Sequence, residues 1–158
     1  MSRKIKKSFE RKQKVTVLML CAVCTLFCWS CQNNMGSNGE DINFLKGTKW
    51  KLAGIFDTEK GNLKVLEPKN CEKCFVLTFN TDSTLLTYDG ANDFLGAYKI
   101  DFVTHNMHIS YLLGTKIAPP GDGSLYIRSL EIIQSFSMKK NELKLFYNDN
   151  KNYLLFKR

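Results

Sequence analysis

Short runs of alternating apolar and polar residues recur from residue 48 to the end of the chain. A period of two is typical of β-strands that bury one face. In the first run Trp50 and Leu52 share a side, and we expect Ile55 to join them. Turn residues separate neighbouring runs, as at Asn80-Thr81-Asp82 and Lys140-Asn141. The pattern predicts strands at 48–56, 74–80, 83–89, 94–102, 107–113, 135–140, 142–148 and 152–158.

One segment, GSLYIRSLEIIQ (123–134), interrupts this series. Tyr126, Leu130 and Ile133 recur at helical spacing, and Asp122 or Ser124 can cap the start. Apolar residues also alternate there, so a strand over 125–133 is the alternative. We therefore expect a mainly β fold: a single antiparallel sheet curled into a small calycin-like half-barrel, with one short α-helix before the last three strands.

Residues 1–30 have the features of a signal peptide. Seven Lys and Arg stand against one acid, a net charge of +6, and an apolar run follows at 15–27. That run is shorter than the about 20 residues that a membrane-spanning helix needs, whereas a basic flank before a short apolar run is typical of a secretory signal. An uncleaved membrane anchor reaching residue 31 is the alternative.

The end of this segment, CWSC, resembles the lipobox of bacterial lipoproteins. There a small residue precedes a cysteine that is lipidated, with palmitate among its acyl chains, and becomes the mature N-terminus. Ser30 precedes Cys31 here, so the resemblance implies lipidation at Cys31. Cys28 and Trp29 depart from the usual lipobox residues. Acyl chains anchor a protein because each buried methylene contributes about 0.8 kcal/mol.

Residues 31–47 form a polar stretch rich in Gly and Asn, which we expect to be a flexible tether. Gln32 after the lipidated cysteine, with Glu40 and Asp41 further on, fits delivery to the outer membrane of a Gram-negative bacterium, facing the periplasm or the surface. Beyond residue 30 the chain holds 16 basic and 14 acidic residues. A net charge of +2 gives no case for nucleic-acid binding.

From about residue 47 onward, the chain resembles the META / HslJ-like domain, a small envelope domain often found in bacterial lipoproteins. TFNTDSTLLTYDGANDFLGAYKI (78–100) is similar to a family stretch in which Gly90 and Asn92 stand in a turn and Gly96 and Tyr98 in the next strand. TKIAPP (115–120) is similar to a second motif, with Thr115 and Pro120. The resemblance implies an envelope role, linked to stress tolerance or secretion in some members, and brings no catalytic residues.

Both motif cysteines of that family are replaced here, by Ala91 and Pro119, and joint replacement implies that the two positions lie near each other. The motif residues also have plain physical interpretations. Gly90 and Asn92 suit turn positions with positive φ, Gly96 permits a close backbone approach, and Tyr98 is expected to be a half-buried strand aromatic. We expect these residues to specify the fold.

Cys71 and Cys74 form a Cys-x-x-Cys pair. Redox catalysis needs a thiolate activated by a helix N-terminus or by cations, and here a predicted strand follows. Zinc normally takes four ligands, but His105 and His108, three apart on a strand, would face opposite sides. A disulfide or free thiols are the main expectations; an exported protein favours the disulfide. We predict no metal site and no cofactor.

The sequence therefore favours a non-enzymatic outer-envelope lipoprotein with a binding or structural, stress-related role. It would have a lipid anchor in the membrane and an envelope protein as partner. The first alternative is a calycin-like carrier of a small apolar ligand, since 11 Phe, six Tyr and two Trp could line a cavity as well as fill a core. The second is a metal or redox protein that uses Cys71, Cys74 and a histidine. The expected segments are a signal at 1–30, a tether at 31–47 and a β domain at 48–158.

Overall fold

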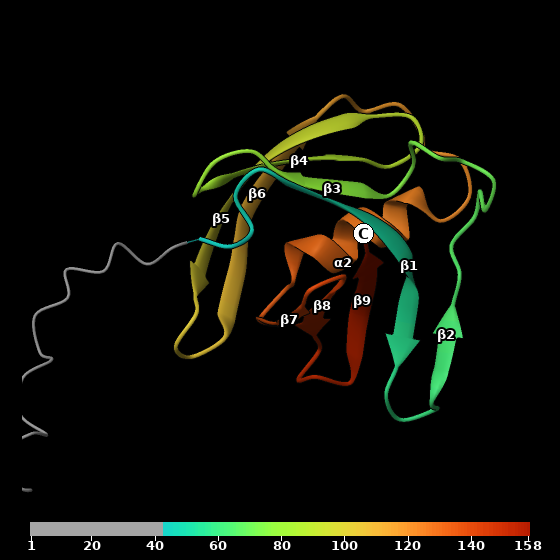
Figure 1. The fold of residues 1–158 in the computed structure, drawn as a ribbon. Helices are drawn as coiled ribbons and strands as arrows, with labels where there is room; N and C mark the ends of the chain where they lie inside the picture. The colour runs from blue at the N-terminus through green and yellow to red at the C-terminus, as the bar shows by residue number, and fades with distance from the viewer. Residues whose placement is uncertain (1–42) are drawn as a thin grey trace, which may run out of the picture. The chain divides into compact units, whose positions relative to one another are not determined.

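A computed structural model describes residues 43–158 as one antiparallel sheet with one helix (Figure 1). The expectation of a mainly β fold with a short helix before the last three strands is confirmed. The residues predicted to form the signal, the lipidation site Cys31 and most of the tether lie outside the described part. The elements are β1 (Thr48–Asp57), β2 (Asn62–Lys64), β3 (Val76–Phe79), β4 (Thr84–Tyr88), β5 (Asp93–Asp101), β6 (Asn106–Gly114), α2 (Gly123–Glu131), β7 (Ser135–Lys139), β8 (Glu142–Tyr147) and β9 (Asn152–Lys157).

The sheet nearly closes into a ring. Its strand order is β2-β1-β3-β4-β5-β6-β7-β8-β9, and a further pairing joins β1 to β9, so the first and last strands meet. The weakest junction is between β6 and β7, where only Asn106 and Ser135 pair. The observed sheet is therefore more nearly closed than the predicted half-barrel. The short strand β2, whose three residues are all exposed, was not predicted.

A bulge in β1 changes which of its residues point into the core. The register with β9 shifts between Leu52 and Gly54, so Ile55 is buried with Trp50 and Leu52 although it lies an odd number of residues from both. The predicted shared side is confirmed. A Cβ atom at Gly54 would lie 2.5 Å from the carbonyl oxygen of Lys64 on β2, so the close approach of β2 requires glycine there.

Helix α2 lies within the curve of the sheet (Figure 1). The segment therefore forms the predicted helix and not the alternative strand. The Tyr126 hydroxyl bonds the Thr87 hydroxyl of β4 at 2.7 Å, and its ring meets Phe75 and Phe156 edge-on. Among the described residues, large side chains fill the interior. Those with almost no exposure are Trp50, Tyr98, Tyr126, Phe79, Phe156, Leu45, Leu77, Leu85, Met107, Ile109, Leu130 and Ile133.

The start of α2 differs from the prediction. Asp122 occupies the N-cap position, but its side chain makes no capping hydrogen bond. Its carboxylate instead accepts from Lys64 Nζ at 2.7 Å and from the backbone N–H of Glu67 at 3.0 Å, which ties the helix start to the segment after β2. Both bonds favour the charged form, so the pKa of Asp122 is below its usual value, with the bond from Lys64 as the largest cause.

The folded part begins earlier than the predicted boundary at residue 48. Leu45 is wholly buried in the core, and the Asn43 side-chain amide donates to the Tyr98 hydroxyl at 2.8 Å. The last residues of the expected tether therefore belong to the domain. Within residues 43–158, the one helix is too short to cross a membrane.

Candidate functional site

Cys71 and Cys74 are joined by a disulfide, with an S–S distance of 1.99 Å and Cα atoms 5.3 Å apart. Cys74 is buried and Cys71 is partly exposed. Phe75 follows with a φ of 57° and leads into β3, so the pair is not followed by a helix. The pair closes a short loop just before a strand, which we name the Cys71–Cys74 clasp.

Lys51 on β1 holds this clasp. Its Nζ donates to the carbonyl oxygens of Cys71 at 2.7 Å, Glu72 at 3.2 Å and Cys74. Burial lowers the pKa of Lys51, and the nearby charge of Glu72 partly offsets that effect. An ammonium group has three donors, and all three are used here. Lys51 therefore pins the loop to the barrel and has no donor left for a ligand.

The two histidines that were considered as zinc ligands do not form a site with the clasp. His105 is an exposed residue with a φ of 59° in the turn before β6, and His108 is exposed on β6 opposite Lys99. Within residues 43–158, no group of three or more His, Cys, Asp and Glu side chains is placed to hold a metal ion.

The two family-like motifs meet at Asn92. Its side-chain oxygen accepts from Thr115 Oγ1 at 2.6 Å and from the backbone N–H of Ile117 at 2.8 Å. Its side-chain nitrogen donates to Asp89 at 2.9 Å and to the Ile117 carbonyl at 2.7 Å. The expectation of a positive φ at Asn92 is wrong, because Asn92 keeps a negative φ and acts through its buried amide.

The remaining motif residues lie near Asn92 or make close contacts between neighbouring segments. Gly90 has a φ of 109°, as predicted, and a Cβ atom there would lie 3.3 Å from Pro120 and 3.5 Å from Cys74 Sγ. A Cβ at Gly96 would lie 2.8 Å from the Tyr111 carbonyl oxygen, so the close approach predicted at Gly96 is present. Tyr98 is not half-buried as expected but 1% exposed, and its hydroxyl donates to the Thr81 carbonyl at 2.8 Å.

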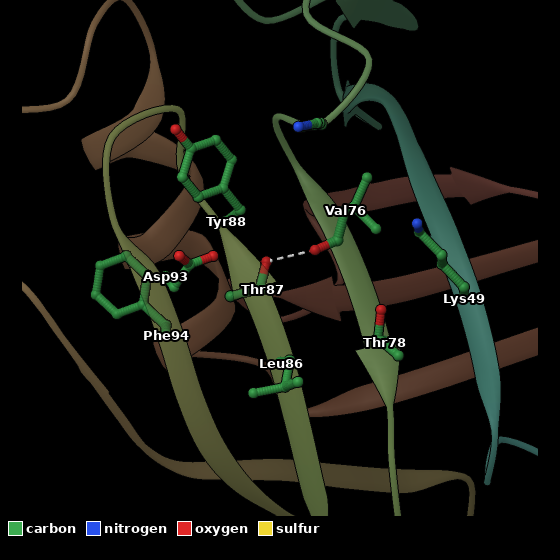
Figure 2. A pocket seen from close by; sticks show the side chains of 9 residues that line it. Lys49, Val76, Thr78, Leu86, Thr87, Tyr88, Asp93 and Phe94 are labelled. Carbon is green, nitrogen blue, oxygen red and sulfur yellow. Dashed lines mark hydrogen bonds between the residues drawn. The ribbon is translucent and has the colours of Figure 1, made fainter.

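A hollow of about 570 Å³ lies on the outside of the barrel, over β1, β3, β4 and β5 (Figure 2). We name it the outer groove. Two lysines and an aspartate line it together with apolar and hydroxyl side chains. The lining residues are Lys49, Lys73, Val76, Thr78, Leu86, Thr87, Tyr88, Asp93 and Phe94. The Thr87 hydroxyl already has a partner within the fold, because it donates to the Val76 carbonyl at 2.8 Å.

A second hollow of about 490 Å³ shares Lys49 and Val76 with the outer groove and extends toward β9. It adds Lys51, Glu72, Lys157 and Arg158, and the guanidinium of Arg158 lies 4.5 Å from the centre of the Trp50 ring. Lys49, Lys73 and Lys157 are exposed, and none makes a salt bridge with a residue of the described part. The arrangement suits the binding of a ligand with an anionic group.

The chain is 30% identical over 151 residues to a protein of Tannerella forsythia named "Putative lipoprotein", and the match covers 92% of this chain and 96% of that one. The chain belongs to the family of this lipoprotein. Residues 48–158 alone are too few to supply such coverage, so the family likeness extends into the N-terminal segment. No protein-family model matches the chain.

Two solved structures share the fold of this lipoprotein family member. A DUF4847 family protein from Bacteroides vulgatus matches with a TM-score of 0.55 at 16% identity, over 72% of this chain and 94% of that one. A protein from Burkholderia xenovorans, solved by NMR, matches with a TM-score of 0.57 at 21% identity, over 72% of this chain and 83% of that one. At these identities the likeness shows the fold alone. The fold makes up nearly all of the B. vulgatus protein, so it folds without a further domain.

Sequence reasoning identified the clasp and the motif residues but missed the outer groove. The outward residues of four strands form it, and they are neighbours only through strand pairing. The alternation in the sequence does place Lys49, Thr78 and Leu86 on outward positions. Their alignment depends on the register between strands, which the alternation does not specify.

Proposed function

We propose that this chain is a lipid-anchored protein of the outer envelope of a Gram-negative bacterium, with a non-enzymatic binding or structural role. The observation that carries the proposal is the match to the T. forsythia lipoprotein, which covers 96% of that protein and extends into the N-terminal segment of this chain. Both chains would then share a leader as well as a β domain.

Cys31 is the proposed site of lipidation. It follows Ser30 at the end of the apolar run, and cleavage before it would leave a tether that reaches the folded part at Asn43. At about 3.3–3.6 Å per residue, the 12 residues from Cys31 to Ile42 reach at most about 40–43 Å. The β domain would therefore stay close to the membrane that holds the anchor.

The β domain is proposed to be META / HslJ-like. The support is that the two motifs, far apart in the sequence, contact each other through Asn92 and Thr115 and through Gly90 and Pro120. The positions of the replaced motif cysteines, Ala91 and Pro119, adjoin these contacts. As in that family, a stress-related role in the envelope would be served by binding rather than by chemistry.

A non-enzymatic role is supported by the state of the candidate reactive groups. The two cysteines of the described part are bonded to each other, Lys51 is held by carbonyl oxygens, and the two histidines are exposed on separate positions of a turn and a strand. The interior, where a calycin-like carrier would hold its ligand, is filled by aromatic and aliphatic side chains. Binding at the outer surface is therefore the better-supported role.

Metabolic labelling with an alkyne analogue of palmitate tests the anchor. Cys31→Ser should lose the label and release the protein from the membrane fraction, whereas the matched control Cys28→Ser should keep both. Label retained on Cys31→Ser, or lost only on Cys28→Ser, would refute the assignment. For the envelope role, a deletion strain should be sensitive to envelope stress and should be rescued by a His105→Ala/His108→Ala variant as well as by the wild type.

A further inference from the structure

The outer face of the barrel carries a line of side chains that begins with a cation and continues with leucines. The strand registers pair Lys49 with Thr78, Thr78 with Leu86, Leu86 with Leu95, and Leu95 with Leu113. These five residues thus form one row across five neighbouring strands, which we name the leucine row. Its three leucines are 41%, 48% and 65% exposed.

An exposed row of neighbouring leucines is informative, because surface hydrophobic residues scattered singly are normal, whereas a contiguous apolar patch can mark a binding site. The inward neighbours of these residues are the buried Leu85 and the glycine at 96, so the leucines are not needed for the core. Side chains directly opposite each other on paired strands are within contact distance. The row therefore offers a continuous apolar strip next to the outer groove.

The length of the strip matches an acyl chain. Neighbouring strands lie about 4.7–4.9 Å apart, so the three intervals from Thr78 to Leu113 span about 14 Å. One leaflet of a bilayer contributes half of a hydrocarbon core of about 30 Å, so an extended acyl chain measures about 15 Å. A single chain laid along the row would cover its three leucines.

Positive charge is concentrated at one end of the row. Lys49 begins it, Lys73 lines the same groove, and Lys157 lines the adjoining hollow. The acid in the groove, Asp93, pairs with Tyr88, two residue pairs away from the pair of Leu86 and Leu95. The adjoining hollow holds one acid, Glu72. An anion placed at Lys49 would therefore have more cations than acids around it, while the apolar part of the same molecule meets leucine.

We propose that the outer groove and the leucine row together bind an anionic amphiphile, an acyl chain that carries a phosphate or carboxylate head. The head lies between Lys49 and Lys73, and the chain extends over Leu86 and Leu95 toward Leu113. The Cys71–Cys74 clasp contributes by positioning Lys73, which lies inside its loop. This inference rests on the proposed binding role and names the class of ligand. It does not depend on lipidation at Cys31, which the labelling experiment tests separately.

The test uses residues 43–158, because the B. vulgatus protein shows that this fold needs no further domain. Dihexanoyl phosphatidylglycerol, kept below its micelle concentration, is titrated while the leucine methyl signals are followed by NMR. We expect saturable shifts at Leu86 and Leu95, the two leucines nearest the head, because a hexanoyl chain is shorter than the row. Dihexanoyl phosphatidylcholine, which has the same chains and no net charge, should bind at least about tenfold more weakly, and inorganic phosphate should leave the leucine signals unchanged.

Paired variants locate the site. Lys49→Glu/Lys73→Glu should weaken phosphatidylglycerol binding by at least about tenfold. The same charge change at Lys139→Glu/Lys140→Glu, at the exposed end of β7 and in the turn after it, should not. Leu95→Ser should also weaken binding, whereas Val103→Ser, at an 85% exposed residue of the β5–β6 turn, should leave it unchanged.

Sedimentation with phosphatidylglycerol or phosphatidylcholine vesicles then separates a membrane lipid from a free amphiphile as the source. If the protein binds anionic vesicles in a way that depends on Lys49 and Lys73, the ligand is a membrane lipid. If it binds only the dissolved, monomeric lipid, the ligand is a free amphiphile. Absence of saturable shifts, equal loss in the control variants, or shifts that depend on protein concentration alone would overturn the proposal. The last result would assign the row to contact between two copies.

Discussion

Asn92 is the residue on which the two motif segments depend. Its buried amide makes hydrogen bonds to Asp89, Thr115 and Ile117, and leaving such buried groups without partners costs about 1–3 kcal/mol each. We expect Asn92→Ala to lower the free energy of unfolding by about 3 kcal/mol. Urea denaturation measures it, and the control Asn80→Ala, at an exposed turn position, should change little. Equal losses in the two variants would contradict this account.

The role of Asn92 shows where sequence reasoning ends at the residue scale. A turn containing Gly90 and Asn92 is a local pattern, and the positive φ at Gly90 followed from it. Two of the partners of Asn92, Thr115 and Ile117, lie 23 and 25 residues later in the chain, and nothing in the local sequence identifies them. The burial of Tyr98 was underestimated for the same reason, since its hydroxyl is satisfied by Asn43 and Thr81 from distant segments.

Tyr126 should make the protein sensitive to alkaline pH. Burial raises the pKa of Tyr126 well above its usual value, and the hydrogen bond with Thr87 offsets this only in part. An unfolded tyrosine loses its proton near pH 10, where folded Tyr126 still holds its own. Above that pH the folded state therefore binds more protons, and the free energy of unfolding falls as the pH rises.

Tyr126→Phe removes this group from the titration. The variant should lose less stability than the wild type between about pH 9 and 11, as measured by urea denaturation at each pH. Tyr111→Phe, which changes an exposed tyrosine, should keep the wild-type slope. A Tyr126→Phe variant with an unchanged slope would mean that other groups control the alkaline response.

At the scale of elements, α2 is held by its buried face. Leu130 is wholly buried, whereas Ile132, just past the helix end, is 53% exposed. Truncating a buried leucine to alanine costs about 2–5 kcal/mol because it removes packing and leaves a cavity. Leu130→Ala should therefore destabilise the protein by that amount, and Ile132→Ala by less than about 0.5 kcal/mol. Thermal unfolding of the two variants distinguishes them, and similar melting temperatures would contradict the proposed packing of α2.

Most elements were predictable because their residues alternate or repeat according to which side faces the core. The runs at 83–89 and 142–148 lie within a residue or two of β4 and β8, and the spacing of Tyr126 and Leu130 marked α2. Strand β2 gave no such signal, since all three of its residues are exposed. The start of the domain was set too late because the one buried residue there, Leu45, stands in a polar stretch.

At the scale of the whole domain, the pairing of β1 with β9 nearly closes the ring, and the core fills its interior. Alternation predicts which face of a strand is buried, but strand order and register depend on contacts between distant segments. The curled sheet was therefore predicted, but its closure through β1 and β9 and the outer groove were not. For the proposed binding role, the filled interior and the hollow exterior favour the outside of the barrel, near the membrane if Cys31 carries the anchor.

Mass spectrometry of the mature N-terminal peptide tests the central claim most directly. The protein is purified from the membrane fraction of its own or a closely related host and digested with protease. We predict that the first residue is Cys31 and that it carries acyl chains, with no peptide from residues 1–30 attached. An unmodified Cys31 preceded by Ser30 in the membrane-bound protein would contradict the assignment of this chain as a lipid-anchored envelope protein.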